Sequence, residues 1–191
     1  IGPPVGLRLG GMEPRGALLA VVDLGQGPLR VVATHLSLGT PRRRRLQAEA
    51  MLAALRDGPE EGVPGLRDGS GQGLPVLCSG PGQGLPVLCN GRGQGLPVLL
   101  LGDLNEWRPG AGGALDTLAP EFALPPPVPS FPSFRPVAAL DRILARPAGM
   151  LRRVAAHDTA LARRASDHLP LVGWVEAVTP SAAEIRRPPA G

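Results

Sequence analysis

The sequence predicts a layered fold of the α/β or α+β class, in which strands and helices share one core. Short apolar runs alternate with turn residues along much of the chain, a pattern typical of strands. One longer segment instead has its apolar residues at helical spacing. The chain has 191 residues, 43% of them hydrophobic, which is enough for one ordinary domain. Strands and helices around a single sheet give such a layered arrangement.

The first predicted elements are two strands and a helix. Residues 17–24 and 29–36 are apolar runs separated by Gly-Gln-Gly-Pro, which indicates two strands joined by a tight connection. Thr40 then suits the cap of a helix, and proline suits its first position. The apolar residues Ala48, Leu52 and Leu55 fall on one face of this helix, and Gly58 ends it.

A tandem repeat follows the helix. Residues 71–103 read GQGLPVLCSGP, GQGLPVLCNGR and GQGLPVLLLGD, three units with a period of 11 residues. Solenoid repeats need larger units, so duplication of one strand is the favoured interpretation. The third copy is then the original strand, and residues 58–92 are a Gly/Pro-rich insertion that forms a surface loop without regular structure. Cys78 and Cys89 occupy equivalent repeat positions and indicate neither a disulfide framework nor a metal cluster.

Three further strands are predicted at residues 96–101, 140–145 and 169–175. Residues 179–191 are expected to form a Pro-rich tail. The domain is therefore expected to span residues 1–178, with the insertion at about 58–92 inside it.

The charge balance leaves the substrate class open. The net charge is +4, and all 20 basic residues are arginine. A GC-rich coding bias explains this better than selection for nucleic acid, because the net charge is modest for a nucleic-acid-binding surface. No apolar stretch approaches the roughly 20 residues of a membrane span. A cytoplasmic location is favoured, although the chain opens at Ile1 and no targeting signal can be judged.

Polar groups flank four of the predicted strands. Two groups follow their strands and two precede theirs, so antiparallel strands would bring all of them to one sheet edge. Such an edge would collect carboxylates, an amide and imidazoles, which is a catalytic set of side chains. Each group alone has a simpler explanation as a turn former or a buried polar residue. The groups are Thr34-His35, Asp103 with Asn105, Asp141, and Asp167-His168.

In these segments the chain resembles the endonuclease/exonuclease/phosphatase superfamily. The resemblance lies in VVATHLSL, LLLGDLNEW, LDRIL and SDHLPL, which match the later motifs of that superfamily in order. It covers roughly residues 13–178 apart from the insertion. The superfamily includes deoxyribonucleases, exonucleases, sphingomyelinases and inositol polyphosphate phosphatases. The resemblance implies a four-layer sandwich of two packed mixed sheets flanked by helices, and a hydrolase of phosphodiesters or phosphomonoesters that uses Mg²⁺ or Mn²⁺.

The resemblance also implies a role for each polar residue. Asp103 and Asn105 would position the attacking water or the phosphoryl group, and Asp167 would help to hold the metal. His35 would contact a phosphoryl oxygen or assist the leaving group. Asp141 would orient His168, and the imidazole of His168 would act as general base or stabilise the transition state. These roles agree with the chemistry of hard cations and carboxylate-paired imidazoles.

Two superfamily residues have no counterpart in the sequence. These are an Asn and a metal-binding Glu, both expected upstream of Glu13, so the chain is expected to begin part-way through the domain. Glu106 directly follows the GDLN motif and does not suit the role of that Glu. The alternative to an enzyme is therefore an inactive, truncated remnant that binds phosphorylated ligands without turnover. Neither the identity of the phosphoester nor an obligate protein partner can be predicted.

Three further features have structural interpretations. Arg42 to Arg45 are favoured as a solvated first helical turn over a set of phosphate contacts. Trp107 and Trp174 are expected to pack within the fold, with a place beside the substrate as the alternative for Trp107.

Overall fold

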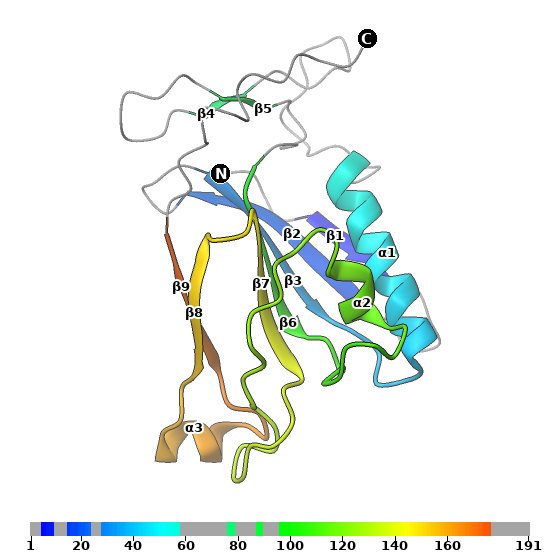
Figure 1. Cartoon of the computed structure of the whole chain (residues 1–191). Coiled ribbons are helices and arrows are strands. Elements are labelled where there is room, and N and C mark those ends of the chain that lie inside the picture. The colour runs from blue at the N-terminus through cyan, green and yellow to red at the C-terminus, as the bar shows by residue number, and fades with distance from the viewer. Residues whose placement is uncertain are drawn as a thin grey trace.

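The computed structural model describes residues 5–9, 15–23, 28–57, 76–78, 87–89 and 96–176. These residues form packed layers of strands and helices, which confirms the predicted α/β sandwich (Figure 1). None of the helices in these ranges is long and apolar enough to cross a membrane.

A mixed five-stranded sheet lies at the centre of the fold, with the strand order β1-β2-β3-β6-β7. β3 and β6 are parallel, and the other neighbouring strands are antiparallel. The strands predicted at residues 17–24, 29–36, 96–101 and 140–145 are all present in this sheet. Their bounds are β1 Val5–Arg8, β2 Gly16–Asp23, β3 Pro28–His35, β6 Val98–Asp103 and β7 Asp141–Arg146.

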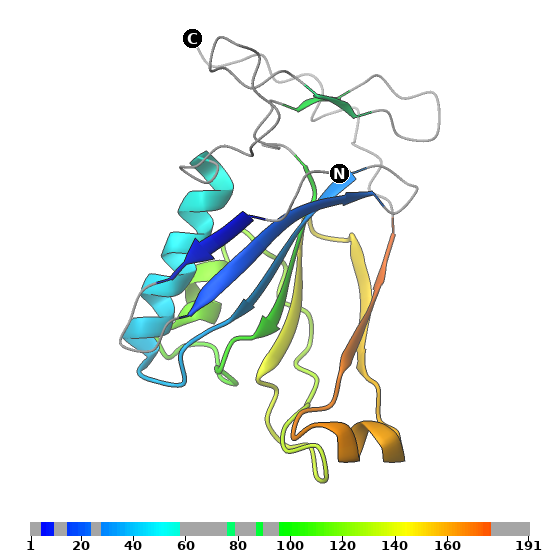
Figure 2. The same ribbon diagram turned by 180° about the vertical axis from the view of Figure 1, so that it is seen from behind.

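Two helices cover one face of this sheet, as Figure 2 shows from behind. The helix α1, Pro41–Asp57, begins where the sequence predicts, and Thr40 Oγ1 accepts a hydrogen bond from Arg43 N at 3.4 Å. The short helix α2, Ala114–Leu118, packs beside it. The main core fills the space between helices and sheet. It includes Val32, Leu100 and Leu144 from the sheet and Ala48, Met51, Leu52 and Leu55 from α1.

A second, two-stranded sheet packs against the opposite face. It contains β8, Leu151–Ala156, and β9, Leu171–Val175, which are antiparallel and joined through the helix α3, Ala160–Ala165. A smaller apolar cluster between the two sheets is built from Leu29, Leu99, Ala145 and Met150. The described residues therefore form three layers, which are helices, large sheet and small sheet, and the fourth layer that the resemblance implies is not seen among them.

The position of β9 differs from the expectation that all four polar groups lie at the edge of one sheet. β7 and β9 belong to different sheets and stack face to face. A Cβ atom added at Gly173 of β9 would lie 3.2 Å from Ile143 Cδ1 of β7. The glycine thus permits this close stacking.

The first two repeat copies also differ from the prediction. β4, Val76–Cys78, and β5, Val87–Cys89, pair with each other in an antiparallel ladder and do not join the central sheet. The expectation that the insertion lacks regular structure is wrong for these two strands. The third copy forms β6, as predicted. The rest of the insertion and residues 177–191, which include the predicted tail, lie outside the described residues.

Candidate active site

Three predicted site residues lie side by side at one edge of the five-stranded sheet, here called the site edge. His35 of β3 is in register with Asp103 of β6, and Asp103 is in register with Asp141 of β7. β3 and β6 end at this edge and β7 begins there. His35 Nε2 lies 3.4 Å from Asp103 Oδ2. Strand pairing alone therefore places two carboxylates and an imidazole in one row.

The turn after β6 is shaped by a glycine and an asparagine. Gly102 has a φ of +139°, and a Cβ atom at this position would lie 1.8 Å from Thr34 O, so only glycine fits between β3 and β6. Asn105 has a φ of 51°, a left-handed conformation that asparagine tolerates better than most residues. Asp103 Oδ1 accepts a hydrogen bond from Asn105 N at 2.7 Å. Both side chains are thus fixed at the site edge.

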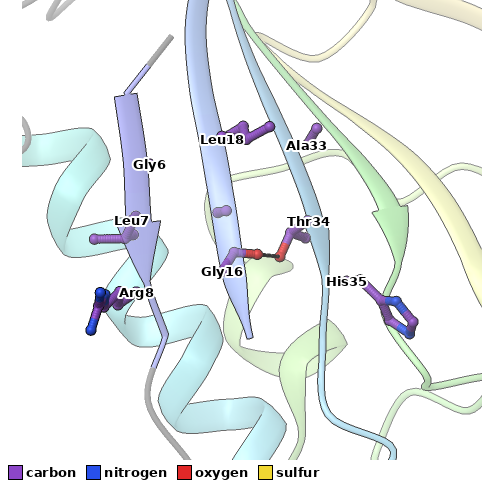
Figure 3. A pocket seen from close by; sticks show the side chains of 9 residues that line it. Gly6, Leu7, Arg8, Gly16, Leu18, Ala33, Thr34 and His35 are labelled. Atoms are coloured by element: carbon purple, nitrogen blue, oxygen red, sulfur yellow. Dashed lines mark hydrogen bonds between the residues drawn. The ribbon is translucent and has the colours of Figure 1, made fainter. Parts of the chain in front are cut away.

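The amide of Asn105 also joins this turn to the end of β3. Its Nδ2 donates a hydrogen bond to Leu36 O at 2.9 Å. Thr34, which was predicted with His35 as one polar group, instead donates its hydroxyl hydrogen to Gly16 O at 3.0 Å, as Figure 3 shows. Thr34 is buried and holds β2 to β3, whereas His35 is exposed at the end of its strand.

His168 reaches the site edge from the segment that precedes β9. Its Nδ1 lies 2.7 Å from Asp141 Oδ2, which forms a carboxylate–imidazole pair. The same carboxylate oxygen accepts a hydrogen bond from Ser130 Oγ at 2.5 Å. The ring of Phe131 packs against the imidazole with centroids 4.9 Å apart. His168 is therefore fixed through one ring nitrogen and one ring face.

Two opposing effects set the protonation of His168. Burial disfavours the charged imidazolium and would lower its pKa. The hydrogen bond and charge of Asp141, together with the charges of Asp103 and Asp167, outweigh burial and raise the pKa of His168 above its usual value. The ring therefore holds a proton to higher pH than an isolated histidine does.

Residues of the loop before β7 hold the segment that carries His168. Ser133 N donates to Asp167 O at 2.7 Å, and Ser133 Oγ donates to Ser166 O at 2.7 Å. The main chain of Ser130 adds a third link, because its carbonyl accepts from Leu169 N at 2.8 Å. Ser130 and Ser133 are both buried. These contacts position the Asp167-His168 segment without touching the imidazole.

A buried charge network lies behind the site edge. Glu106, only 3% exposed, accepts hydrogen bonds from Arg44 Nε at 3.3 Å and from Ala114 N at the start of α2 at 2.7 Å. Arg142 is also buried, which lowers its pKa, and the charge of Glu106 opposes that shift. The expectation that Arg42 to Arg45 form a solvated turn is therefore wrong for Arg44, which is buried. Arg44 joins α1 to the turn that carries Asp103.

The site edge offers suitable ligands for a hard divalent cation. Asp103, Asp141 and His168 each offer one ligand atom, and these three atoms lie within 4.8 Å of one another. The Nδ1 of His168 is engaged by Asp141, so the carboxylates are the stronger candidates as ligands, and carboxylate oxygens are what Mg²⁺ and Mn²⁺ prefer. Asp167, the predicted ligand, is exposed and does not belong to this group of three. Its charge nevertheless acts on His168.

Comparisons with known proteins give one family match and several similar solved structures. Residues 82–168 match the model of the Endonuclease/Exonuclease/phosphatase family. The chain is similar in structure to a functionally unknown conserved protein from Enterococcus faecalis V583, with a TM-score of 0.63 at 17% identity. It is also similar to the mannosyl-6-phosphatase of Bacteroides thetaiotaomicron VPI-5482, with a TM-score of 0.60 at 13% sequence identity. A third similar structure is the endonuclease/exonuclease/phosphatase of Bacteroides vulgatus, with a TM-score of 0.56 at 16% sequence identity. The family match covers a little under half of the chain, and the solved structures share its fold.

These comparisons cover most of this chain and less of the solved structures. The aligned regions include 92%, 88% and 91% of this chain, but 66%, 64% and 65% of the three solved chains. No curated protein sequence matches the chain. At these identities the structural similarity shows the superfamily fold.

The predicted residues of the superfamily site are only partly brought together. His35, Asp103, Asn105, Asp141 and His168 all lie at the site edge, while the exposed carboxylate of Asp167 lies outside the group formed by Asp103, Asp141 and His168. Ser130 could not be predicted as a site residue, because it lies in a Pro-rich segment without periodicity. Glu106 had no predicted role, and its buried contacts with Arg44 and the start of α2 are seen only in the fold.

An open depression adjoins the site edge on the face of β1, β2 and β3 that is turned away from the helices. Its volume is about 590 Å³, and its lining includes Leu18, Ala33 and His35 (Figure 3). The lining contains no carboxylate. The depression therefore borders the polar cluster without containing it.

Proposed function

We propose that the protein hydrolyses phosphoester bonds at the site edge with the help of a divalent cation. The observation that carries the proposal is the Asp141–His168 pair, 2.7 Å between Oδ2 and Nδ1, at the edge where Asp103 and His35 also lie. The match of residues 82–168 to the Endonuclease/Exonuclease/phosphatase family supports a phosphoester hydrolase of this kind. The similar mannosyl-6-phosphatase of Bacteroides thetaiotaomicron supports a phosphoester substrate, while the choice between diester and monoester stays open.

His168 and Asp141 have the central role in this proposal. Asp141 engages Nδ1, so Nε2 is the nitrogen that meets the substrate. A neutral His168 accepts a proton from the attacking water, and the imidazolium then stabilises the negative charge that develops on the phosphoryl oxygens. Asp141 stabilises that imidazolium.

The remaining residues orient the attacking water and bind the phosphoryl group or the cation. The carboxylate of Asp103, held by Asn105 N, orients the attacking water, and the amide of Asn105 contacts the phosphoryl group. His35 donates a hydrogen bond to a phosphoryl oxygen. Asp103, Asp141 and Asp167 are the candidates to hold Mg²⁺ or Mn²⁺. The bound cation would offset charge on the phosphoryl group.

The proposal is tested with a diester, bis(p-nitrophenyl) phosphate, and a monoester, p-nitrophenyl phosphate, in the presence of Mn²⁺. His168→Ala should reduce turnover by about 100-fold or more, because general acid–base groups contribute that much or more. His157→Ala is the matched control, since this exposed histidine lies outside the cluster, and its turnover should equal that of the unchanged protein. Equal turnover in both variants would reject the site. Phosphate binding without any turnover would favour the ligand-binding remnant.

A further inference from the structure

The most exposed large apolar side chains of the described residues belong to segments at the end of the sheet where the site edge lies. Four of them are at least 70% exposed, whereas each of the other large apolar side chains exposes 56% or less. Trp107, on the turn after β6, adds an aromatic ring that is 54% exposed. The four most exposed residues are Leu38 at 75%, Phe134 at 72%, Val137 at 70% and Leu161 at 70%.

These residues come from separate segments that meet at one end of the molecule. Leu38 lies between β3 and α1, Phe134 and Val137 lie in the loop before β7, and Leu161 lies in α3. Figure 1 shows α3, the loop before β7 and the turns after β3 and β6 at the same end of the sheet. We call the exposed residues Leu38, Trp107, Phe134, Val137 and Leu161 the apolar rim.

Arginines are interleaved with the apolar rim. Arg108 adjoins Trp107 and lies 5.9 Å from the centre of its ring. Arg135 stands between Phe134 and Val137, and Arg164 follows Leu161 in α3. Arg42 adds a further exposed charge at the start of α1. Each apolar element of the rim therefore has a positive charge close to it in sequence.

The most prominent part of the rim is held in place. Phe134 O accepts a hydrogen bond from Arg163 Nη1 at 2.8 Å, and Arg163 is itself paired with Asp158 through Nε at 2.6 Å. Ser133 adds the two hydrogen bonds to the Asp167-His168 segment. The loop therefore presents Phe134 in a fixed position relative to His168.

We propose that the apolar rim docks the protein onto an anionic phospholipid surface and that the site acts on a phosphoester carried by a lipid at that surface. Exposed apolar side chains become favourable when they enter the acyl boundary, and the arginines beside them are attracted to anionic headgroups. A lipid phosphoester lies at the depth where this combination of contacts exists. The inference rests on the proposed function for its substrate, but the docking step does not require turnover.

Docking is tested by flotation of the 191-residue chain with vesicles in a chelating buffer. The vesicles contain phosphatidylcholine alone or phosphatidylcholine with phosphatidylglycerol. The chain should float with the anionic vesicles and much less with the neutral ones, and added salt should weaken binding. Phe134→Thr combined with Val137→Thr should weaken binding about tenfold, because two apolar side chains no longer enter the lipid.

The matched control is Val172→Thr combined with Trp174→Thr, which changes an exposed aliphatic and an exposed aromatic residue on β9. This pair should bind vesicles like the unchanged chain, and circular dichroism checks that both double variants are folded. Equal losses in the two double variants, or no preference for anionic vesicles, would overturn the proposal. If the rim variant instead abolished a dimer or the binding of single-stranded DNA, the rim would belong to that partner.

His168→Ala separates docking from catalysis. This variant should still float with anionic vesicles, since His168 is not part of the rim. Vesicle binding with no hydrolysis of any phosphoester would support docking and reject the proposed function. Hydrolysis of soluble esters without vesicle binding would support the proposed function and reject docking.

Discussion

Burial and the neighbouring carboxylates together set the pKa of His168. Burial opposes its charge, and the Asp141 carboxylate at 2.7 Å overcomes that effect with help from Asp103 and Asp167. Because the folded-state pKa is raised, the stability that protonated His168 contributes is fully present below the unfolded pKa. It is lost as the pH rises through the folded pKa. The same titration decides how much of the neutral, proton-accepting ring exists at a given pH.

We therefore predict that Asp141→Asn lowers the pKa of His168, because it removes the carboxylate's charge and leaves burial in place. The chain has only 3 histidines, so their ring proton signals can be assigned by single substitutions and followed by NMR over a pH titration. The midpoint of His168 should fall in the variant. An unchanged or higher midpoint for His168 would show that Asp141 does not control the ring.

At the scale of elements, Glu106 joins three parts of the fold. Its carboxylate contacts Arg44 of α1 and the first residue of α2, and it directly follows the turn that carries Asp103 and Asn105. A carboxylate buried with an arginine leaves an uncompensated charge when either partner is removed. The active-site turn therefore depends on a contact that is remote from the substrate.

Glu106→Ala should reduce the free energy of unfolding by about 3 kcal/mol, because Arg44 and Arg142 then keep their burial and lose their counter-charge. Urea denaturation measures the change. Arg42→Ala is the matched control on the exposed side of the same helical turn, and it should change stability by less than about 0.5 kcal/mol. Similar small effects in both variants would mean that the buried network does not support the turn.

The paired strands β4 and β5 make no ladder with the central sheet. We therefore expect deletion of residues 71–92 to leave the free energy of unfolding unchanged within about 0.5 kcal/mol, or to raise it, because a shorter loop costs less entropy to close. Deletion of residues 71–81 alone removes β4 and leaves β5 without its partner, and it should be tolerated equally well. A loss of folded protein in either deletion, measured by the same denaturation, would assign the repeat a structural role.

The elements also differ in how far the sequence predicts them. Long apolar runs that are bounded by turn residues, such as residues 29–36, predict a strand with few competing structures. β8 was missed because LRRVAA places two arginines inside a strand, and β1 was missed because four residues give little periodicity. The helices α2 and α3 have five and six residues, too few to show a helical pattern. These short elements are stabilised by packing on the sheets, which a local sequence pattern does not reveal.

At the scale of the whole molecule, strand register assembles the site. From the sequence, His35, Asp103 and Asp141 were expected at one sheet edge if strands of the two kinds ran antiparallel. The parallel pairing of β3 with β6 and the antiparallel pairing of β6 with β7 place the three residues side by side. The support from Ser130 and Ser133 could not be predicted, because it depends on how an irregular loop folds back onto the His168 segment. Such contacts leave no periodic trace in a sequence.

The whole-molecule account predicts that catalysis needs a divalent cation as well as the Asp141–His168 pair. The carboxylates at the site edge repel one another and a phosphoryl group unless a cation lies between them.

The most direct test is hydrolysis of bis(p-nitrophenyl) phosphate by the protein before and after removal of metal with excess chelator. We predict that turnover falls to the background rate in chelator and returns when Mg²⁺ or Mn²⁺ is added back in excess. Asp103→Asn should respond weakly to the added metal, since it loses a carboxylate of the site edge. Undiminished hydrolysis in excess chelator would contradict the central claim that this edge of the sheet is a metal-dependent phosphoesterase site.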